Sequence, residues 1–209
     1  MPERCSIVNY NKFWIYYSFM DKLDFYFKHP TTIQVSGPTR CGKTRLVRCV
    51  LEKQIIHNGW RDEIFDTLSP KQRNIIILDD QMSTASSSQS VADLFTRGSH
   101  HRNLTVIYLV QNVYNHGKSQ RTISLNSHYS VVFRNGRDAS QFRTMAYQIC
   151  PSDARWLLDA FTDATSKPYG YLVLDHHPST PEDHTVVTHI LPGEQLTYYI
   201  NNHPKLKHN

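Results

Sequence analysis

The sequence lacks the cysteine and histidine patterns of metal-binding and disulfide-stabilised proteins. Its four cysteines, among 209 residues, include no Cys-x-x-Cys pair, which excludes a disulfide framework and suits a reducing compartment. Its twelve histidines include no His-Glu-x-x-His arrangement, and neighbours such as His100 and His101 would point to opposite faces of a strand. We therefore expect no zinc site.

Long apolar runs and a secretory signal are also missing. Residues 10–27 are dense in aromatic side chains, but Asp21, Lys22 and Asp24 interrupt them, so no run approaches the ~20 apolar residues that cross a bilayer. The same stretch has neither a basic start nor a small-residue cleavage site. We expect residues 1–28 to form an aromatic N-terminal extension, as an extra packing helix or a poorly evolved leader, with no role in a membrane. The protein is then intracellular and not secreted.

Charge of one sign is not concentrated anywhere. Charged residues make up 20% of the chain, the net charge is +5, and Lys and Arg are scattered without a block. This mild positive balance is consistent with contact to nucleic acid. The absence of a basic block argues against a sequence-specific DNA-binding module.

One motif is informative: residues 37–44 read Gly-Pro-Thr-Arg-Cys-Gly-Lys-Thr and fit the phosphate-binding P-loop pattern Gly-x4-Gly-Lys-[Ser/Thr]. A β-branched run at 31–35 precedes it and a helical pattern at 43–56 follows it, which is the context the motif needs. A loop of this kind holds phosphates with its backbone amides. The residues expected to bind ATP are Gly37, Pro38, Thr39, Arg40, Cys41, Gly42, Lys43 and Thr44.

Acidic and amide side chains follow two later apolar runs. Residues 74–80 carry four aliphatics into Asp79 and Asp80, as a buried parallel strand does at its carboxyl end. Asp79, with the Thr44 hydroxyl, is expected to hold Mg²⁺, and Asp80 to polarise the attacking water. Gln111 follows the run 104–110. It would orient the γ-phosphate, or it is simply a polar strand end that meets solvent.

Strand and helix patterns alternate along the chain, which predicts an α/β fold with a mostly parallel sheet flanked by helices. Right-handed crossovers would bring the loop, the two aspartates and Gln111 to one edge of that sheet. We expect a P-loop NTPase domain over residues 29–200 and a polar tail at 201–209. The expected strands are 31–35, 74–80, 104–110, 129–133 and 170–175, with a hairpin in 185–200, and the expected helices are 43–56, 90–95, 138–149 and 152–164.

Three arginines, Arg97, Arg102 and Arg121, follow the two aspartates and are candidates for an arginine that stabilises the transition state. They lie within two of five longer segments, 93–107 and 121–129 among them, that are specific enough to suggest a family. Together the segments resemble the DNA-packaging ATPases of Polinton/Maverick elements and adintovirus-like viruses, in the FtsK–HerA group with the poxvirus virion-packaging ATPase. The resemblance covers roughly residues 29–177 and rests on 93–107, 111–112, 121–129, 135–140 and 163–172.

The resemblance implies a homo-oligomeric ring that hydrolyses ATP, with Mg²⁺, to pump double-stranded DNA into a capsid. It implies that Gln111 is the strand-end glutamine of the family and that Arg102 acts on a neighbouring subunit's site. Its partners would be non-specific DNA and a capsid or portal component, at the virion assembly site or in the nucleus of a host cell.

Two other interpretations come from the same residues. Relatives usually carry a longer stretch, with another strand, between the positions of Lys43 and Asp79. On the first interpretation, this part has been lost, and the chain is a truncated, catalytically inactive remnant of such an ATPase in an integrated element. A small-molecule kinase would need an arginine-rich lid, and no arginine cluster of that kind is present.

Overall fold

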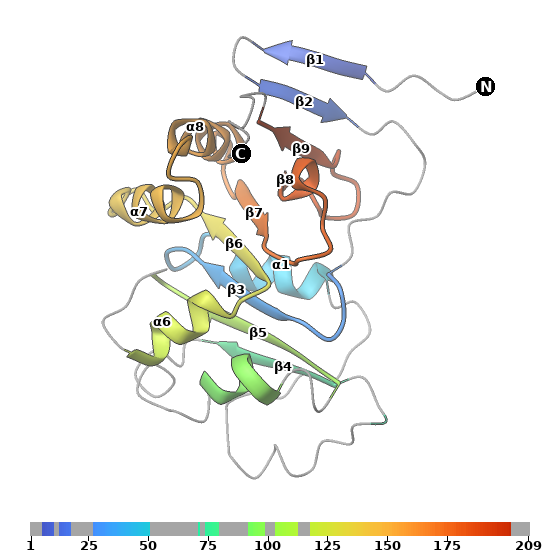
Figure 1. Ribbon diagram of the computed structural model, residues 1–209, viewed down its shortest axis with the longest axis vertical. Coiled ribbons are helices and arrows are strands. Elements are labelled where there is room, and N and C mark those ends of the chain that lie inside the picture. The colour runs from blue at the N-terminus through green and yellow to red at the C-terminus, as the bar shows by residue number, and fades with distance from the viewer. Residues whose placement is uncertain are drawn as a thin grey trace, which may run out of the picture.

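The computed structural model places the described strands in one mixed sheet (Figure 1). Across these residues the sheet has nine strands in the order β1-β2-β9-β8-β7-β6-β3-β5-β4. None of the described helices is long and apolar enough to cross a lipid bilayer. The structure describes residues 6–10, 13–17, 27–50, 71, 74–79, 92–98, 103–112 and 118–201.

Four strands form a parallel half that matches the expected apolar runs. They are β3 (Thr32–Ser36), β4 (Asn74–Asp79), β5 (Leu104–Val110) and β6 (Tyr129–Phe133), in the order β4-β5-β3-β6. All seven residues of β5 are buried, because helices cover both faces of this half and leave no face for polar residues. The predicted α/β fold of P-loop type is confirmed here.

The other half of the sheet is antiparallel. β7 (Tyr171–Asp175) runs against β6, and β8 (Val186–Thr188) and β9 (Thr197–Ile200) form the predicted C-terminal hairpin, with Val187 opposite Tyr198. The strand at 170–175 and the hairpin were predicted, but the antiparallel direction of β7 was not. Two helices, Ser140–Ile149 and Ala154–Ala164, join β6 to β7, so in the sequence this connection resembles the strand–helix alternation that predicts parallel strands.

Within the N-terminal extension, the structure describes a pair of strands. β1 (Ser6–Tyr10) and β2 (Phe13–Tyr17) are antiparallel, and β2 pairs with β9, with Trp14 opposite Ile200. The expected packing helix is therefore wrong for these residues. Aromatic residues favour strands, and the free edge of β9 offers the backbone partners that a separate helix would not use.

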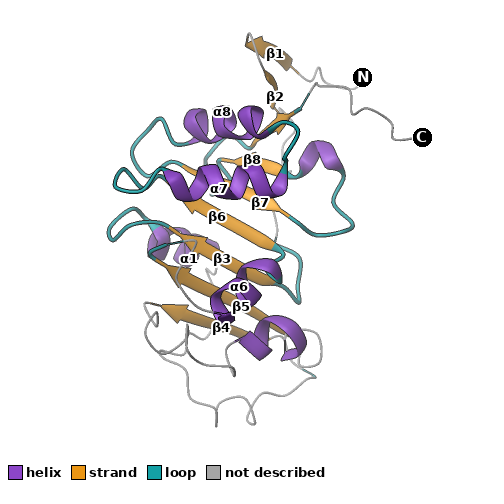
Figure 2. Ribbon diagram, turned by 60° about the vertical axis from the view of Figure 1, so that its left-hand side comes forward, coloured by secondary structure: helices purple, strands orange, loops and turns teal. Residues whose placement is uncertain are grey.

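Helices cover the two faces of the sheet unequally (Figure 2). α1 (Lys43–Val50) lies on one face, where Leu46 and Val47 pack against alternate residues of β3 and β6. The other face carries α7 (Ser140–Ile149) and α8 (Ala154–Ala164), and also η1 (Leu94–Gly98), a π-helical turn, and α6 (Lys118–Leu125). The sequence did not predict α6, which has few apolar residues besides the fully buried Ile123.

Candidate nucleotide-binding site

The loop between β3 and α1 is tied to the end of a neighbouring strand. The Gly37 N–H donates to the Val110 carbonyl at 3.1 Å, and the Cys41 N–H donates to the Pro38 carbonyl at 3.3 Å. The Leu46 N–H donates to the Gly42 carbonyl at 2.9 Å, which begins the hydrogen bonding of α1. The loop is thus a compact turn that leads into a helix N-terminus, where anions bind.

Two positions of the loop require glycine. A Cβ on Gly37 would lie 2.7 Å from the Phe133 Cβ and 2.8 Å from the Cys41 Sγ. Gly42 has a φ of +111°, which side-chain-bearing residues avoid. The loop backbone therefore packs directly against the end of β6.

Lys43 holds its ammonium group over the loop. Its Nζ donates to the Gly37 carbonyl at 2.6 Å and to the Pro38 carbonyl at 3.0 Å. An ammonium has three donors, so this position leaves one to reach a phosphate held by the same loop. The charge is thus fixed at the mouth of the loop.

The carboxyl ends of the parallel strands meet beside the loop. Asp79 stands opposite Leu109 in the register of β4 and β5, and Ser36 stands opposite both Val110 and Val132. A cavity of about 360 Å³ at this edge joins the three segments that sequence reasoning selected. It is lined by Thr39, Arg40, Gly42, Lys43, Thr44, Arg45, Asp79, Leu109, Val110 and Gln111.

The oxygen donors of this cavity fit Mg²⁺. Thr44 contributes a hydroxyl and Asp79 an exposed carboxylate. Within the described part of the chain no three His, Cys, Asp or Glu residues gather as a metal site of their own. Mg²⁺ characteristically takes one or two protein oxygens and completes its shell with water and substrate phosphates.

Several predicted residues are placed differently or lie outside the described residues. Gln111 follows β5, is exposed, and still lines the cavity, so it is both a strand end that meets solvent and a neighbour of the loop. Asp80 and Arg102 lie outside the described residues, as does the side chain of Arg97. Arg121 is exposed on α6 and does not line the cavity of Lys43.

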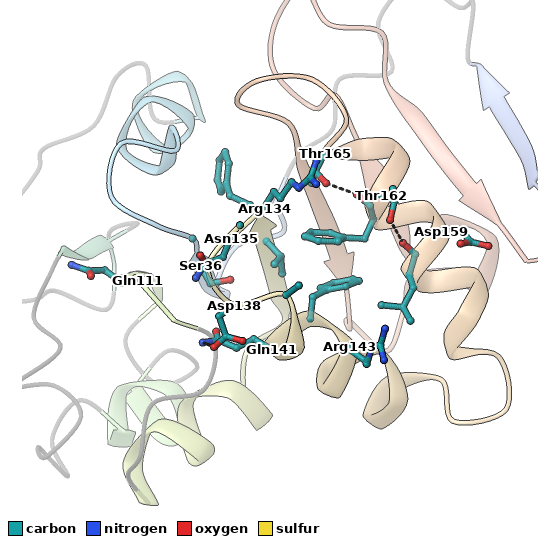
Figure 3. A pocket seen from close by; sticks show the side chains of 18 of the residues that line it. Ser36, Gln111, Arg134, Asn135, Asp138, Gln141, Arg143, Asp159, Thr162 and Thr165 are labelled. Carbon is teal, nitrogen blue, oxygen red and sulfur yellow. Dashed lines mark hydrogen bonds between the residues drawn. The ribbon is translucent and has the colours of Figure 1, made fainter.

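A second cavity, of about 500 Å³, borders the loop from the helix-rich side and was not predicted (Figure 3). It reaches Ser36, Gly37 and Gln111, and its wall includes Phe142 and Phe161, whose rings stack with centroids 3.8 Å apart. The only sequence signal was the polar run 134–138 after β6. The loop is therefore open on this side as well.

Part of that wall is the polar start of α7. The Gln141 amide donates to the Asp138 carboxylate at 2.7 Å, and the Ser140 hydroxyl donates to the same carboxylate at 2.5 Å. The hydrogen bond from Ser140, followed by that from Gln141, holds the pKa of Asp138 below its usual value. Asp138 thus binds two side chains of the first turn of α7.

Cys41 places a free thiol in the loop, and its alkylation can be measured. Burial raises the pKa of its thiol above the ordinary value, although the nearby charge of Lys43 opposes the rise. Since the thiolate is the nucleophile, alkylation of Cys41 should be slow at neutral pH and should accelerate as pH rises toward the raised pKa. The adduct should block ATP binding, because the Sγ packs against Gly37.

This expectation can be checked by mass spectrometry of the iodoacetamide-treated protein across a pH series, with and without ATP. Cys150, a partly exposed free thiol in the same chain, serves as internal reference. Protection of Cys41 by ATP, with Cys150 unaffected, is the expected result. Equal labelling of Cys41 in both samples would contradict the assignment of the loop.

These features define a fold: a mixed sheet with a phosphate-binding loop at the carboxyl edge of its parallel half, the fold of P-loop NTPases. The genome-packaging NTPase B204 from Sulfolobus turreted icosahedral virus 2 shares it. In complex with AMP that protein matches with a TM-score of 0.53 and 16% identity, over 73% of this chain and 96% of that chain. Its complex with ATP-gammaS matches with a TM-score of 0.53 and 16% identity, over 72% and 95%.

B204, the DNA-packaging ATPase from Sulfolobus Turreted Icosahedral Virus, matches with a TM-score of 0.52 and 13% identity, over 85% of this chain and 100% of that chain. No protein-family model matches the sequence. No curated protein matches it either. At these identities the likeness is one of fold.

Proposed function

We propose that this chain is an ATP-driven DNA-packaging ATPase that uses Mg-ATP hydrolysis to move double-stranded DNA into a viral capsid. The observation that carries the proposal is the 360 Å³ cavity, which gathers Lys43, Thr44, Asp79 and Gln111 from three separate segments. A loop lysine, a hydroxyl, a strand-end carboxylate and a strand-end amide are the parts that phosphoryl transfer to water needs.

The chemistry assigned to these groups is mainly electrostatic. The loop amides and Lys43 neutralise the β- and γ-phosphates, and Thr44 and Asp79 hold Mg²⁺, which supplies further charge stabilisation when bound. Asp80, next after β4, accepts the proton of the attacking water. Gln111 orients the γ-phosphate from the end of β5.

The packaging role draws on two likenesses. The viral B204 proteins that share the fold are described as a genome-packaging NTPase and a DNA-packaging ATPase. The segments quoted above resemble the Polinton/Maverick and adintovirus-like enzymes of the FtsK–HerA group. On this basis the chain forms a ring around DNA, docks on a capsid or portal component at the virion assembly site or in the nucleus, and contacts the phosphate backbone without reading bases.

In such a ring Arg102 is proposed to act on the neighbouring subunit's ATP. Arg102→Ala should then lower turnover by a large factor, since an arginine finger contributes about 10³ to 10⁵ in rate. Its ATP affinity should stay near that of the wild type, as measured by calorimetry on the same preparation. Loss of ATP binding would place Arg102 in its own subunit's pocket instead.

The direct test of the proposed function is Mg²⁺-dependent ATP hydrolysis with and without long double-stranded DNA. Turnover that DNA stimulates, irrespective of its sequence, is the expected result. Turnover that DNA leaves unchanged would argue against a translocase. Turnover that rises only with a small phosphate acceptor would favour a kinase.

A second candidate is a truncated, inactive remnant of the same enzyme. It is favoured by the short interval between Lys43 and Asp79 and by the position of β4, which forms the edge of the sheet in the described part of the chain. An unpaired edge strand promotes association. ATP binding without any hydrolysis, in a protein that aggregates, would support the remnant.

A further inference from the structure

A third cavity, of about 380 Å³, adjoins the loop on the side away from Asp79. It shares Gly42 and Arg45 with the cavity of Lys43, but its other walls come from α1, β6, β7, the end of α8 and the segments that follow α8 and β8. The strand order β7-β6-β3-β5-β4 puts the two cavities over opposite halves of the sheet, with the loop between them. They meet at Gly42.

The direction of a bound triphosphate then follows. If the γ-phosphate faces Thr44, Asp79 and Gln111, the α-phosphate and the nucleoside must leave the loop in the opposite direction. That direction leads past Gly42 into the 380 Å³ cavity. We propose that this cavity holds the nucleoside of the nucleotide, with the ring of Tyr169 as the stacking surface for its base. The proposal rests on the nucleotide-binding function proposed above.

Residues with a left-handed backbone conformation are concentrated around the same two cavities. In the described residues, four non-glycine residues have a left-handed φ: Arg40 (66°), Asn103 (50°), Tyr169 (64°) and His189 (57°). Three of them line the two cavities that meet at Gly42, Arg40 in one and Tyr169 with His189 in the other. Residues held in such disfavoured conformations gather at ligand sites, where the surrounding structure enforces them.

Tyr169 is held firmly but its ring is free to accept a base. The turn that carries it is fixed by the Gly170 N–H donating to the Lys167 carbonyl at 3.1 Å. A Cβ on Gly170 would lie 2.4 Å from the Ala164 carbonyl oxygen, so the turn is packed against the end of α8. The side chain of Tyr169 is nevertheless 63% exposed. Its ring lies beside Gly42, where an added Cβ would be 3.5 Å from its Cδ1.

The opposite wall is equally fixed. The Tyr171 hydroxyl donates to a Glu194 carboxylate oxygen at 2.6 Å and accepts from the Ile190 N–H at 2.9 Å, which anchors the chain next to His189. Burial, with the Glu194 carboxylate, raises the pKa of Tyr171, so its hydroxyl stays a donor. An exposed aromatic ring in a rigid frame at the end of a phosphate loop is suited to stack a base, since stacking needs little reorganisation.

The test separates the base from the phosphates. Binding of ATP and of inorganic triphosphate is measured by calorimetry for the wild type, Tyr169→Ala and Tyr169→Phe. Tyr147→Ala removes an equally prominent exposed tyrosine, 57% exposed on α7, and is the matched control. Tyr169→Ala should weaken ATP by about 5- to 100-fold, the range expected when one base–aromatic stack is lost. Its binding of triphosphate should not change, and Tyr169→Phe should bind ATP like the wild type.

Each other outcome has a distinct meaning. Unchanged ATP affinity in Tyr169→Ala overturns the nucleoside site and leaves the proposed function intact. Equal weakening of ATP and triphosphate in Tyr169→Ala also overturns it, since Tyr169 would then act through the loop. A wild type that binds neither compound refutes the proposed function itself.

A second measurement does not depend on a variant. Photolysis of the wild type with 8-azido-ATP should label the peptide that contains Tyr169, and excess ATP should prevent the labelling. Label that ATP displaces from a peptide elsewhere in the chain would overturn the proposal. Inorganic triphosphate in excess should also compete, because the loop holds both compounds.

Discussion

Replacing Lys43 by alanine should lower Mg²⁺-dependent ATP hydrolysis by about 100-fold or more, the loss typical when one preorganised charge donor is removed from a transition state. The side chain lies over the loop, with its Nζ 2.6 Å from the Gly37 carbonyl and 3.0 Å from the Pro38 carbonyl. Among the described residues no other lysine lines the 360 Å³ cavity, and the arginines there, Arg40 and Arg45, are exposed. Their long, solvated side chains are poor substitutes for an ammonium fixed at the loop.

Arg48→Ala is the matched control for this measurement. Arg48 carries the same charge on the same helix, is exposed, and lines none of the three cavities described. Both variants should melt near the wild-type temperature, because the apolar face of α1 is formed by Leu46 and Val47. Hydrolysis by Lys43→Ala at the wild-type rate would remove the basis for the site.

The second large effect is expected at Asp80. Asp80→Asn should bind ATP normally and lose about 100-fold or more in turnover, because it keeps the shape of the side chain and removes the proton acceptor for water. Asp79→Asn is the variant to compare with it. It removes a carboxylate that lines the cavity beside Thr44, so it should raise the Mg²⁺ concentration needed for half-maximal turnover.

Rates measured across a Mg²⁺ series for both variants separate the two roles. The expected pattern is a turnover defect in Asp80→Asn that Mg²⁺ does not rescue and a defect in Asp79→Asn that high Mg²⁺ lessens. The reverse pattern would exchange the roles of the two aspartates. Full activity in Asp80→Asn would mean that the base is another residue.

The parallel half of the fold was predictable because its strands are buried on both faces. A run such as that of β5 has no solvent side, so nearly every residue must be apolar, and the run is visible in the sequence. The loop was predictable for a similar reason: Gly37 and Gly42 occupy positions that other residues cannot. Where packing leaves little choice, one sequence is enough to locate an element.

Other features were missed because their determinants are not local. β1 and β2 were taken for a helix, and their strand form depends on pairing with β9, far along the chain. α6 is mostly polar and is positioned through Ile123. The left-handed conformation of Tyr169 is imposed by its surroundings, since a bulky residue such as tyrosine does not prefer a positive φ. The cavity beside it was therefore invisible in the sequence.

The pairing of β2 with β9 also sets an order of events during synthesis. β1 and β2 leave the ribosome before the other described strands and can pair with each other at once. The partner of β2 in the sheet, Thr197–Ile200, is the last of the described strands to be made, so the two cannot join until translation has passed the whole nucleotide site. Contacts so distant in sequence form slowly. The open side of β2 therefore stays unpaired while residues 18–196 are made, and during this interval the newborn chain most needs protection from neighbouring copies.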